Sequence, residues 1–467
     1  MSKQDSLLDE VGAIVVSCPT SPPPPSSSKM LPRICHLFRL KYVLLGLVII
    51  FFLDFFGIFT HFFEHDFHKN FDYPLNDPNV IHYAKQIRNS EIPDVPPINT
   101  YNYTYISNCH HKCRQAGDDE TLIVPRVVFI IKSAMNNFNR RSAIRQSWGY
   151  EKRFSDVIVR TVFTVGINNG QTEEQRNIQT LIEKEREQFD DIVQAKFIDS
   201  YFNNTIKTMM GFRWAIEYCP RSRFFMFIDD DYYVSTKNVL RFLRNPINYP
   251  EYLEDADETL RKLARRLSQS DLLSKNQTFT AHNNENVQEI QDLMDQNGIH
   301  TIDAKDHMNQ IKNYLAKAHE RENKQNVVQR QLLDTDLPYD VKLFSGFIFK
   351  SKPHRHKTSK WYVSLNEYKW HMWPTYVTAG SFILSREALI EMYYMSMYTK
   401  HFRFDDIYLG IVAFKANIEP LHSEEFYFYK NNYIGPQSYR YVIATHGYDD
   451  PNEMLRVWTE LRASGHA

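Results

Sequence analysis

Three consecutive aspartates, Asp229, Asp230 and Asp231, are the residues of this sequence that are best placed to do chemistry. They follow an apolar run of strand character, FFMFI, over 224–228. A buried strand that delivers acidic side chains at its carboxyl end is how open α/β sheets place chemistry in a crevice. The three carboxylates repel one another, and a divalent cation with oxygen ligands, Mg²⁺ or Mn²⁺ rather than Zn²⁺, would compensate them. Taken alone, a solvated acidic turn or a helix cap explains them equally well.

A second acidic pair and a group of arginines are further candidates for chemistry. Asp405 and Asp406 lie in HFRFDDIYL at a predicted helix start, where aspartate is commonly a cap but could also act as a general base. Arg140, Arg141 and Arg145 lie in NRRSAIRQSWG, which has helical spacing. Helix N-termini and arginines both favour phosphate, so this stretch could bind an anion. A solvated basic helix face explains the arginines equally well.

The elements that must position these residues alternate between strands and helices, which indicates a mostly parallel α/β sheet flanked by helices. No dinucleotide-binding or Walker glycine motif interrupts them. Small residues over 378–381 mark a place where backbone could approach a ligand closely. A charged stretch at about 250–335 is predicted to be a surface insertion without a catalytic role. Predicted strands run over 122–132, 157–165, 192–198, 224–228 and 341–350, and predicted helices over 139–149, 172–189, 205–218 and 386–397.

The N-terminal part of the chain predicts membrane attachment. Residues 1–41 form a cytosolic tail with a Pro/Ser run that should be disordered. Basic residues precede an apolar stretch over 42–60, of which 18 or so residues would span about 27 Å as a helix. This predicts a retained signal anchor with the bulk of the chain in the lumen, against the alternative of a buried helix in a soluble protein. Residues 61–120 are expected to form a stem, and 121–467 the catalytic domain.

Composition and cysteines agree with that placement. With 55 Lys and Arg against 56 Asp and Glu, the net charge of −1 gives no electrostatic case for nucleic acid binding. Glycosylation sequons begin at Asn102, Asn203 and Asn276. Cys109, Cys113 and Cys219 would lie in an oxidising compartment, and three is odd, so one thiol is free or pairs with another chain. A disulfide between Cys109 and Cys113, or a bridge to Cys219, is favoured over a zinc site.

Seven motifs in order resemble the inverting β-1,3-galactosyltransferase family, which includes N-acetylglucosaminyl- and N-acetylgalactosaminyltransferases. The resemblance covers nearly all of 122–460 outside the insertion and implies a GT-A fold, a UDP-sugar donor and Mn²⁺. It also implies a single-pass type II protein of the Golgi membrane with a lumenal catalytic domain. The motifs are RRSAIRQSWG (140–149), DSYFNNTIKT (199–208), FIDDDYYV (227–234), KWYVSLNEY (360–368), PTYVTAGSFILS (374–385), FDDIYLG (404–410) and VIATHGYDDPNEMLRVW (442–458).

The same resemblance implies a role for individual residues. Asp231 would be the direct metal ligand, with Asp229 and His446 supporting it. Asp406 would be the base that deprotonates an acceptor sugar, with Asp405 as the alternate base. Two departures are that Val377 replaces a cysteine of the family and that the glycine-rich stretch is reduced to Ala379, Gly380 and Ser381. The donor-binding residues implied are Arg141, Arg145, Trp148, Lys207, Asp229 and Asp230.

The function implied is transfer of galactose from UDP-galactose, in β-1,3 linkage, to a glycan on a glycoprotein or glycolipid. An N-acetylglucosamine or N-acetylgalactosamine donor is the alternative within the class. A non-catalytic lumenal binding or folding partner is an alternative of another class. The mutually repelling carboxylates argue against it, Asp231 and Asp406 among them, because a protein without catalytic activity gains nothing from them. A glycoside hydrolase would use paired acids but needs neither the aspartate triad nor phosphate-binding arginines.

Overall fold

The computed structural model describes residues 31–73, 79–254 and 337–467 of the chain. These residues form two compact units, one from the segments up to Glu64 and over 354–369, and the other from the remainder. The predicted insertion at 250–335 and the Asn276 sequon lie almost wholly outside the described residues, as does the Pro/Ser tail.

The smaller unit contains α1 (Leu31–Phe55) and the 3-10 helix η1 (Thr60–Phe63). Buried Arg355 holds it together, because its guanidinium pairs with Glu64 at 2.8 Å and donates to the carbonyls of Val363 and Tyr368, both at 2.8 Å. Throughout the described part of the chain, no helix is at once long enough and apolar enough to cross a membrane. The membrane span predicted over 42–60 is therefore not confirmed.

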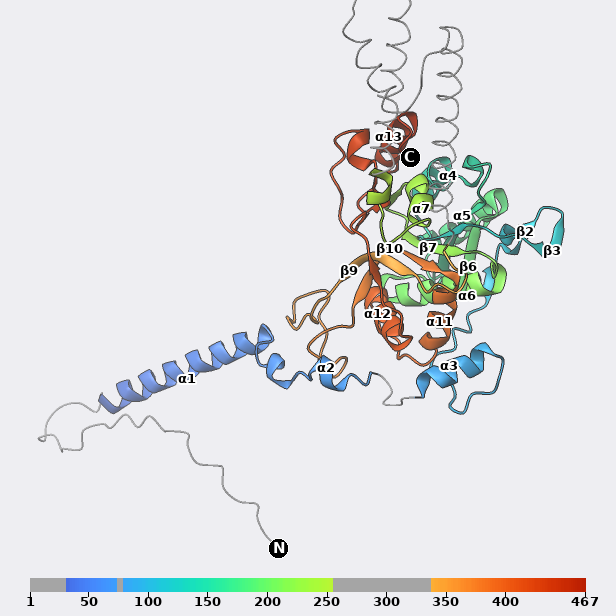
Figure 1. Cartoon of the computed structure of the whole chain (residues 1–467). Helices are drawn as coiled ribbons and strands as arrows, with labels where there is room; N and C mark the ends of the chain where they lie inside the picture. The colour runs from blue at the N-terminus through green and yellow to red at the C-terminus, as the bar shows by residue number, and fades with distance from the viewer. Residues whose placement is uncertain (1–30, 74–78, 255–336) are drawn as a thin grey trace, which may run out of the picture. The chain divides into compact units, whose positions relative to one another are not determined.

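The larger unit is built on an eight-stranded sheet of order β1-β6-β5-β4-β7-β10-β9-β11 (Figure 1). The β6-β5, β5-β4, β4-β7 and β9-β11 pairs are parallel and the other three are antiparallel, so the predicted mixed, mostly parallel α/β sheet is confirmed. Its strands are β1 (Tyr105–Ser107), β4 (Val127–Lys132), β5 (Val159–Ile167), β6 (Ile192–Ile198), β7 (Phe224–Asp229), β9 (Phe344–Phe349), β10 (Tyr376–Ser385) and β11 (Leu421–His422).

Helices cover both faces of this sheet. A smaller three-stranded sheet, of order β12-β13-β8, extends the larger unit, and β2 and β3 form a separate hairpin. The helices are α2 (Phe67–Asn70), α3 (Val80–Arg88), α4 (Phe138–Gln146), α5 (Glu173–Phe189), α6 (Asn204–Tyr218), α7 (Thr236–Phe242), α11 (Arg386–Ser396), α12 (Asp405–Lys415) and α13 (Pro451–Ala463), and the short strands are β2 (Arg114–Gln115), β3 (Asp118–Leu122), β8 (Tyr233–Val234), β12 (Phe426–Tyr427) and β13 (Ala444–Thr445).

The central strand β7 is buried on both faces, which explains its uninterrupted apolar run. Met226 and Ile228 point into a core shared with α4, α7 and α13. Phe227 points the other way, where its ring lies 4.8 Å from that of Phe212 on α6 and 5.0 Å from that of Phe382 on β10. Because β4 runs parallel beside β7 with Lys132 opposite Asp229, both strands deliver polar side chains to the same edge of the sheet.

Strand β10 contains an irregularity that matters for that edge. Its register against β9 shifts between Val377 and Phe382, so the small residues between them leave the regular ladder. A side chain at Gly380 would place its Cβ 2.3 Å from the hydroxyl of Tyr232. The close approach that the sequence led us to expect for a ligand is thus made by an aromatic ring of the protein itself.

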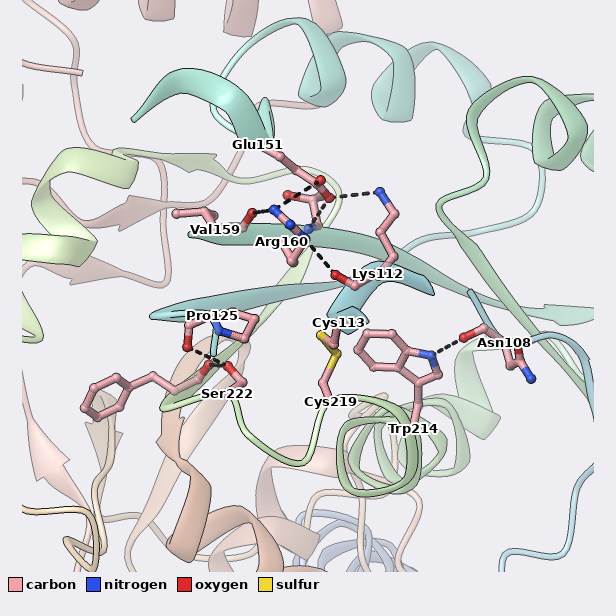
Figure 2. Close-up of a disulfide and its surroundings, with 12 residues drawn as sticks. Asn108, Lys112, Cys113, Pro125, Glu151, Val159, Arg160, Trp214, Cys219 and Ser222 are labelled. Atoms are coloured by element: carbon pink, nitrogen blue, oxygen red, sulfur yellow. Dashed lines mark hydrogen bonds and ion pairs between the residues drawn. A yellow bond between two sulfur atoms is a disulfide. The ribbon is translucent and has the colours of Figure 1, made fainter. Parts of the chain in front are cut away.

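Part of the predicted stem belongs to the folded unit. Strand β1 pairs antiparallel with β6 as the edge of the main sheet. A disulfide between Cys113 and Cys219 then ties the segment after β1 to the end of α6, where Trp214 donates to the Asn108 carbonyl (Figure 2). Cys109 is a buried free thiol. Of the alternatives open from the sequence, the bridge to Cys219 is therefore the one that forms.

Removing this disulfide is expected to destabilise the larger unit markedly. It closes a loop with a sequence separation of 106 residues, and loss of a native disulfide typically costs about 2–5 kcal/mol. Thermal unfolding of a Cys113→Ala, Cys219→Ala double variant should occur at a lower temperature than that of the parent. Added reductant should lower the parent's unfolding temperature but leave that of the double variant unchanged. A variant as stable as the parent would contradict this prediction.

Candidate active site

Lys132, the last residue of β4, joins the two acidic groups of the sequence. Its ammonium lies 3.0 Å from Asp229 Oδ1 and 3.1 Å from Asp405 Oδ2, and it donates to the Ala379 carbonyl at 2.8 Å. Burial by itself lowers the pKa of Lys132, but the two carboxylates outweigh it and leave that pKa raised, so the side chain stays charged. Sequence reasoning missed Lys132, because a lysine at the end of an apolar strand carries no motif. The one available hint was that the aspartates repel one another, so that a compensating positive charge had to lie nearby.

Asp230 holds the loop that follows β4. Its carboxylate accepts hydrogen bonds from Ser133 Oγ at 2.6 Å and Asn137 Nδ2 at 2.9 Å, and it pairs with Arg140 Nη1 at 3.0 Å. The side chain is buried. Asp230 therefore shapes the 133–137 loop through these contacts with protein groups.

Asp231 is different, because one of its oxygens has no partner. Oδ2 lies 3.3 Å from His446 Nε2, whereas Oδ1 is buried without a hydrogen bond within the described structure. Burial raises the pKa of Asp231, but His446 and Arg140 outweigh it and lower that pKa overall. A buried ionised oxygen without a partner is rare, and a cation would satisfy it.

The residues present fit a divalent cation with oxygen ligands. Burial, and then the nearby charges of Asp231 and Asp405, raise the pKa of Asp229 to about 7 in spite of Lys132. A cation beside Asp229 would favour its ionised form. Asp231, Asp229 and His446 would hold the ion, and a carboxylate set suits Mn²⁺ or Mg²⁺. In the described ranges no three His, Cys, Asp or Glu side chains are already gathered as ligands. Binding would therefore require these side chains to reorient.

A cavity of about 550 Å³ opens beside the three aspartates. Lys207 lines it and is held by Asp199 at 2.7 Å and by the Ser133 carbonyl at 2.8 Å. The volume of the cavity is in the range of small-molecule sites. The lining residues are Lys132, Ser133, Ala134, Met135, Asn136, Asn137, Asn168, Gln175, Ile178, Asp199, Ser200, Tyr201, Asn204, Lys207, Asp229, Asp230, Asp231 and His446.

Three predicted donor-binding residues do not line this cavity. Arg141 is fully buried, and its guanidinium is bound by Glu185 at 2.7 Å and by the Ala134 carbonyl at 2.6 Å. Arg145 pairs with Glu185 and Asp191, both at 2.7 Å. Trp148 is 1% exposed. Arg141 thus braces the 133–137 loop, and both arginines are neutralised by protein carboxylates. The side chain of Trp148 is covered by protein atoms.

Arg140, one of the three arginines of the predicted basic helix but not one of the implied donor-binding residues, is the arginine of α4 that reaches the acidic triad. Its guanidinium pairs with Asp230 at 3.0 Å and Asp449 at 2.6 Å, and lies 3.9 Å from Asp231. The side chain is 23% exposed. Helical spacing alone could not separate Arg140 from Arg141, since neighbouring residues of a helix point to different faces and either face could have been the inner one.

Asp405 and Asp406 begin α12 as predicted, but only one of them is uncommitted. Asp405 Oδ2 accepts from Lys132 and from Thr208 Oγ1 at 3.2 Å. Asp406 is half-buried, and its Oδ1 accepts a hydrogen bond from the neighbouring Ile407 amide at 2.7 Å. Burial, and then the charge of Asp405, raise the pKa of Asp406 to about 7. The arrangement therefore offers a cation site at Asp231 and a proton acceptor at Asp406, joined through Asp229, Lys132 and Asp405.

Comparison with known proteins identifies a family for this arrangement. The family model described as Galactosyltransferase matches residues 139–259 and 323–424, which include the aspartate triad and the Asp405–Asp406 pair but not His446. The unmatched residues between these ranges lie inside the predicted insertion.

Individual curated proteins match over most of the chain. Beta-1,3-galactosyltransferase brn of Drosophila melanogaster is 36% identical over 432 residues, covering 92% of this chain and 99% of that protein. Beta-1,3-galactosyltransferase 1 of Homo sapiens is 24% identical over 370 residues, covering 79% of this chain and 82% of that protein. Beta-1,3-galactosyltransferase 2 of Mus musculus is 23% identical over 374 residues, covering 79% of this chain and 64% of that protein.

Proposed function

The chain belongs to the galactosyltransferase family and is a glycosyltransferase, and from this premise we propose that it transfers galactose from UDP-galactose, in β-1,3 linkage and with inversion, to a glycan of a glycoprotein or glycolipid. The observation that carries the proposal is that Asp231 has a buried oxygen without a partner beside the cavity, while Asp406 stands at the start of α12 with a raised pKa. Lys132 links the two regions by pairing with Asp229 and Asp405. A GT-A fold is part of the proposal, supported by strand β7 delivering the aspartate triad.

In the proposed reaction, Asp406 accepts the proton of an acceptor hydroxyl while that oxygen attacks C1 of the donor sugar. The new bond joins the acceptor oxygen to C1, the bond from C1 to the phosphate oxygen breaks, and UDP leaves with the electron pair. Attack from the face opposite the leaving group converts an α-linked donor into a β-linked product. Lys207, which lines the cavity, and Arg140, which lies 3.9 Å from Asp231, would stabilise the negative charge that develops on the diphosphate. Mn²⁺ bound at Asp231 would act there as a Lewis acid.

The donor and the metal are tested together. Full-length protein, with a panel of UDP-sugars and acceptor glycosides, is expected to release UDP from UDP-galactose when Mn²⁺ is present and to stop when a chelator is added. Asp231→Ala should remove the activity, since the uncommitted oxygen is lost, whereas Asp449→Ala at the exposed end of the same ion-pair group should retain it. Turnover of UDP-N-acetylglucosamine or UDP-N-acetylgalactosamine instead would change the donor, and tight glycan binding without any UDP release would favour the binding-protein alternative.

Activity is expected to depend on pH through Asp406. A general base works only when it is deprotonated, so kcat/KM should fall as the pH drops below the raised pKa of Asp406, which is about 7. An aspartate at its usual pKa of about 3.9 would show no such fall above about pH 5. The pH profile at saturating Mn²⁺ measures this. A rate that stays constant down to about pH 5 would contradict the assignment of Asp406 as the base.

The proposal also places the protein in the Golgi membrane with its catalytic domain in the lumen, attached through residues 42–60. The basic residues before that segment and the Cys113–Cys219 bridge support an oxidising, lumenal location. Asn102 is exposed, whereas Asn203 is half-buried and its amide donates to the Ile198 carbonyl at 2.7 Å. Glycosidase treatment should therefore remove a glycan from Asn102 in expressed protein, and an Asn102→Gln variant should lose it.

A further inference from the structure

Five aromatic side chains from β9, β10 and the segment after β12 form one connected surface, which we call the aromatic platform. Phe349 stacks on Tyr376 across the β9–β10 pair, with ring centroids 5.8 Å apart. Phe428 lies 4.7 Å from Phe347 and 4.9 Å from Phe349, and the Tyr429 ring is 5.1 Å from that of Phe428. Phe428 is 39% and Tyr429 50% exposed, so the platform is not simply core.

One end of the platform lies beside the proposed base. Asp406 and Gly410 are four residues apart and so lie on the same face of α12. That face meets Tyr376 directly, because a Cβ at Gly410 would lie 2.5 Å from Tyr376 Cβ. Tyr376 is itself fixed by a hydrogen bond between its hydroxyl and Ser351 Oγ at 2.9 Å. Tyr376, the first residue of the platform, therefore packs against the helix face that carries Asp406.

The other end of the platform is tied to the metal side of the site. Strand β12, which ends immediately before Phe428, pairs with β13, and the His446 amide donates to the Tyr427 carbonyl at 3.1 Å. Thr445 Oγ1 donates to the Tyr429 carbonyl, also at 3.1 Å. The backbone that carries Phe428 and Tyr429 is thus hydrogen-bonded to the segment that carries His446, the residue beside Asp231.

We propose that the aromatic platform binds the acceptor glycan, with Phe428 and Tyr429 stacking against the C–H faces of pyranose rings and Tyr376 next to the attacking hydroxyl. The inference rests on the proposed function and extends it to the acceptor. An exposed aromatic patch that is continuous with an active site is typical of a ligand-binding surface. Flat rings suit sugars in particular, because a pyranose presents an apolar face while its hydroxyls remain in water. Its position between Asp406 and His446 commits it to the acceptor rather than to a separate protein partner.

The test separates acceptor binding from donor chemistry in the full-length enzyme. The acceptors are the methyl β-glycosides of galactose, glucose, mannose and N-acetylglucosamine, and the donor readout is UDP release without acceptor. We expect a Phe428→Ala, Tyr429→Ala double variant to raise the KM of the best acceptor about tenfold or more. The donor KM and acceptor-free UDP release should remain those of the parent. The matched control is Tyr150→Ala, since Tyr150 is 52% exposed beside the 3-10 helix η3 (Glu151–Arg153), away from the platform, and should change neither value.

An acceptor KM in the double variant within about twofold of the parent would overturn the inference, as would an equal rise in the control. If the double variant also loses acceptor-free UDP release, its fold is damaged and the single variants F428L and Y429L are compared instead. Leucine keeps the apolar volume but not the flat ring, so these variants should still raise the acceptor KM while leaving the donor KM unchanged. A parent enzyme that releases UDP from none of the donors would instead overturn the proposed function, and this is seen before any variant is compared.

Discussion

Asp406→Asn should lower kcat by about 10²–10⁴-fold, the usual contribution of a positioned general base. The asparagine keeps the shape of the side chain but has no basic oxygen to take the acceptor proton. The thermal unfolding temperature should not fall. Asp406 is half-buried beside Asp405, and its raised pKa means that the folded state disfavours its charge. Donor binding, measured by titration with UDP and Mn²⁺, should also be unchanged, because Asp406 does not line the cavity beside the aspartate triad.

Asp405→Asn is the matched control for that experiment. Asp405 accepts from both Lys132 and Thr208, so its replacement should lower stability as well as activity. Loss of activity at full stability therefore distinguishes the base from the residue that positions it. If Asp406→Asn retains the kcat of the parent, the base is misassigned and Asp405 becomes the alternative.

Lys132→Met should have the largest effect on stability. The variant leaves Asp229 and Asp405 without their shared cation, and breaking a buried ion pair by removing one partner costs about 3–5 kcal/mol. Activity should be lost as well, since the same ammonium holds together the end of β7, the Ala379 carbonyl within β10 and the start of α12. The free energy of unfolding measured with denaturant, together with UDP release, tests both expectations.

Lys184→Met provides the comparison, because Lys184 is exposed on α5 and should tolerate the change. Lys132→Arg adds a second test: it keeps the charge but not the compact shape, so it should recover part of the stability and little of the activity. A Lys132→Met variant as stable as the Lys184 variant would show that the two aspartates do not depend on this lysine.

Most of the strands and helices were predictable from the sequence because their patterns are local. Strand β6 begins and ends at the predicted residues, and α5, α6 and α11 lie within one residue of their predicted bounds, whereas α4 ends at Gln146, three residues before its predicted end. The pairing of β1 with β6 was not predictable, since a three-residue edge strand in a Pro-rich region gives no periodic signal. The sequence showed that small residues gather in β10, but it did not show the register shift there. The need for glycine at position 380 becomes clear only from the Tyr232 ring, which leaves no room for a Cβ.

The candidate site was predictable in its charges and not in its contacts. The sequence identified Asp229, Asp230, Asp231, Asp405 and Asp406, and repulsion among them implied a compensating cation. It could not show that Lys132 supplies part of that charge, nor that Asp230 is bound by its own loop while Asp231 retains a bare oxygen. It also could not separate Arg140 from Arg141, whose positions differ by one residue but whose partners are Asp230 and Glu185 respectively. These distinctions depend on which side of an element faces the cavity.

The most direct test of the whole account is the structure of the reaction product. Full-length enzyme with UDP-galactose, Mn²⁺ and the best methyl glycoside acceptor should give a disaccharide whose NMR spectrum shows a β anomeric proton and a bond to O3 of the acceptor. Such a product shows inversion at C1, as a single displacement gives, and Asp406→Asn should form it far more slowly. A product with an α linkage, or release of free galactose in place of a disaccharide, would contradict it.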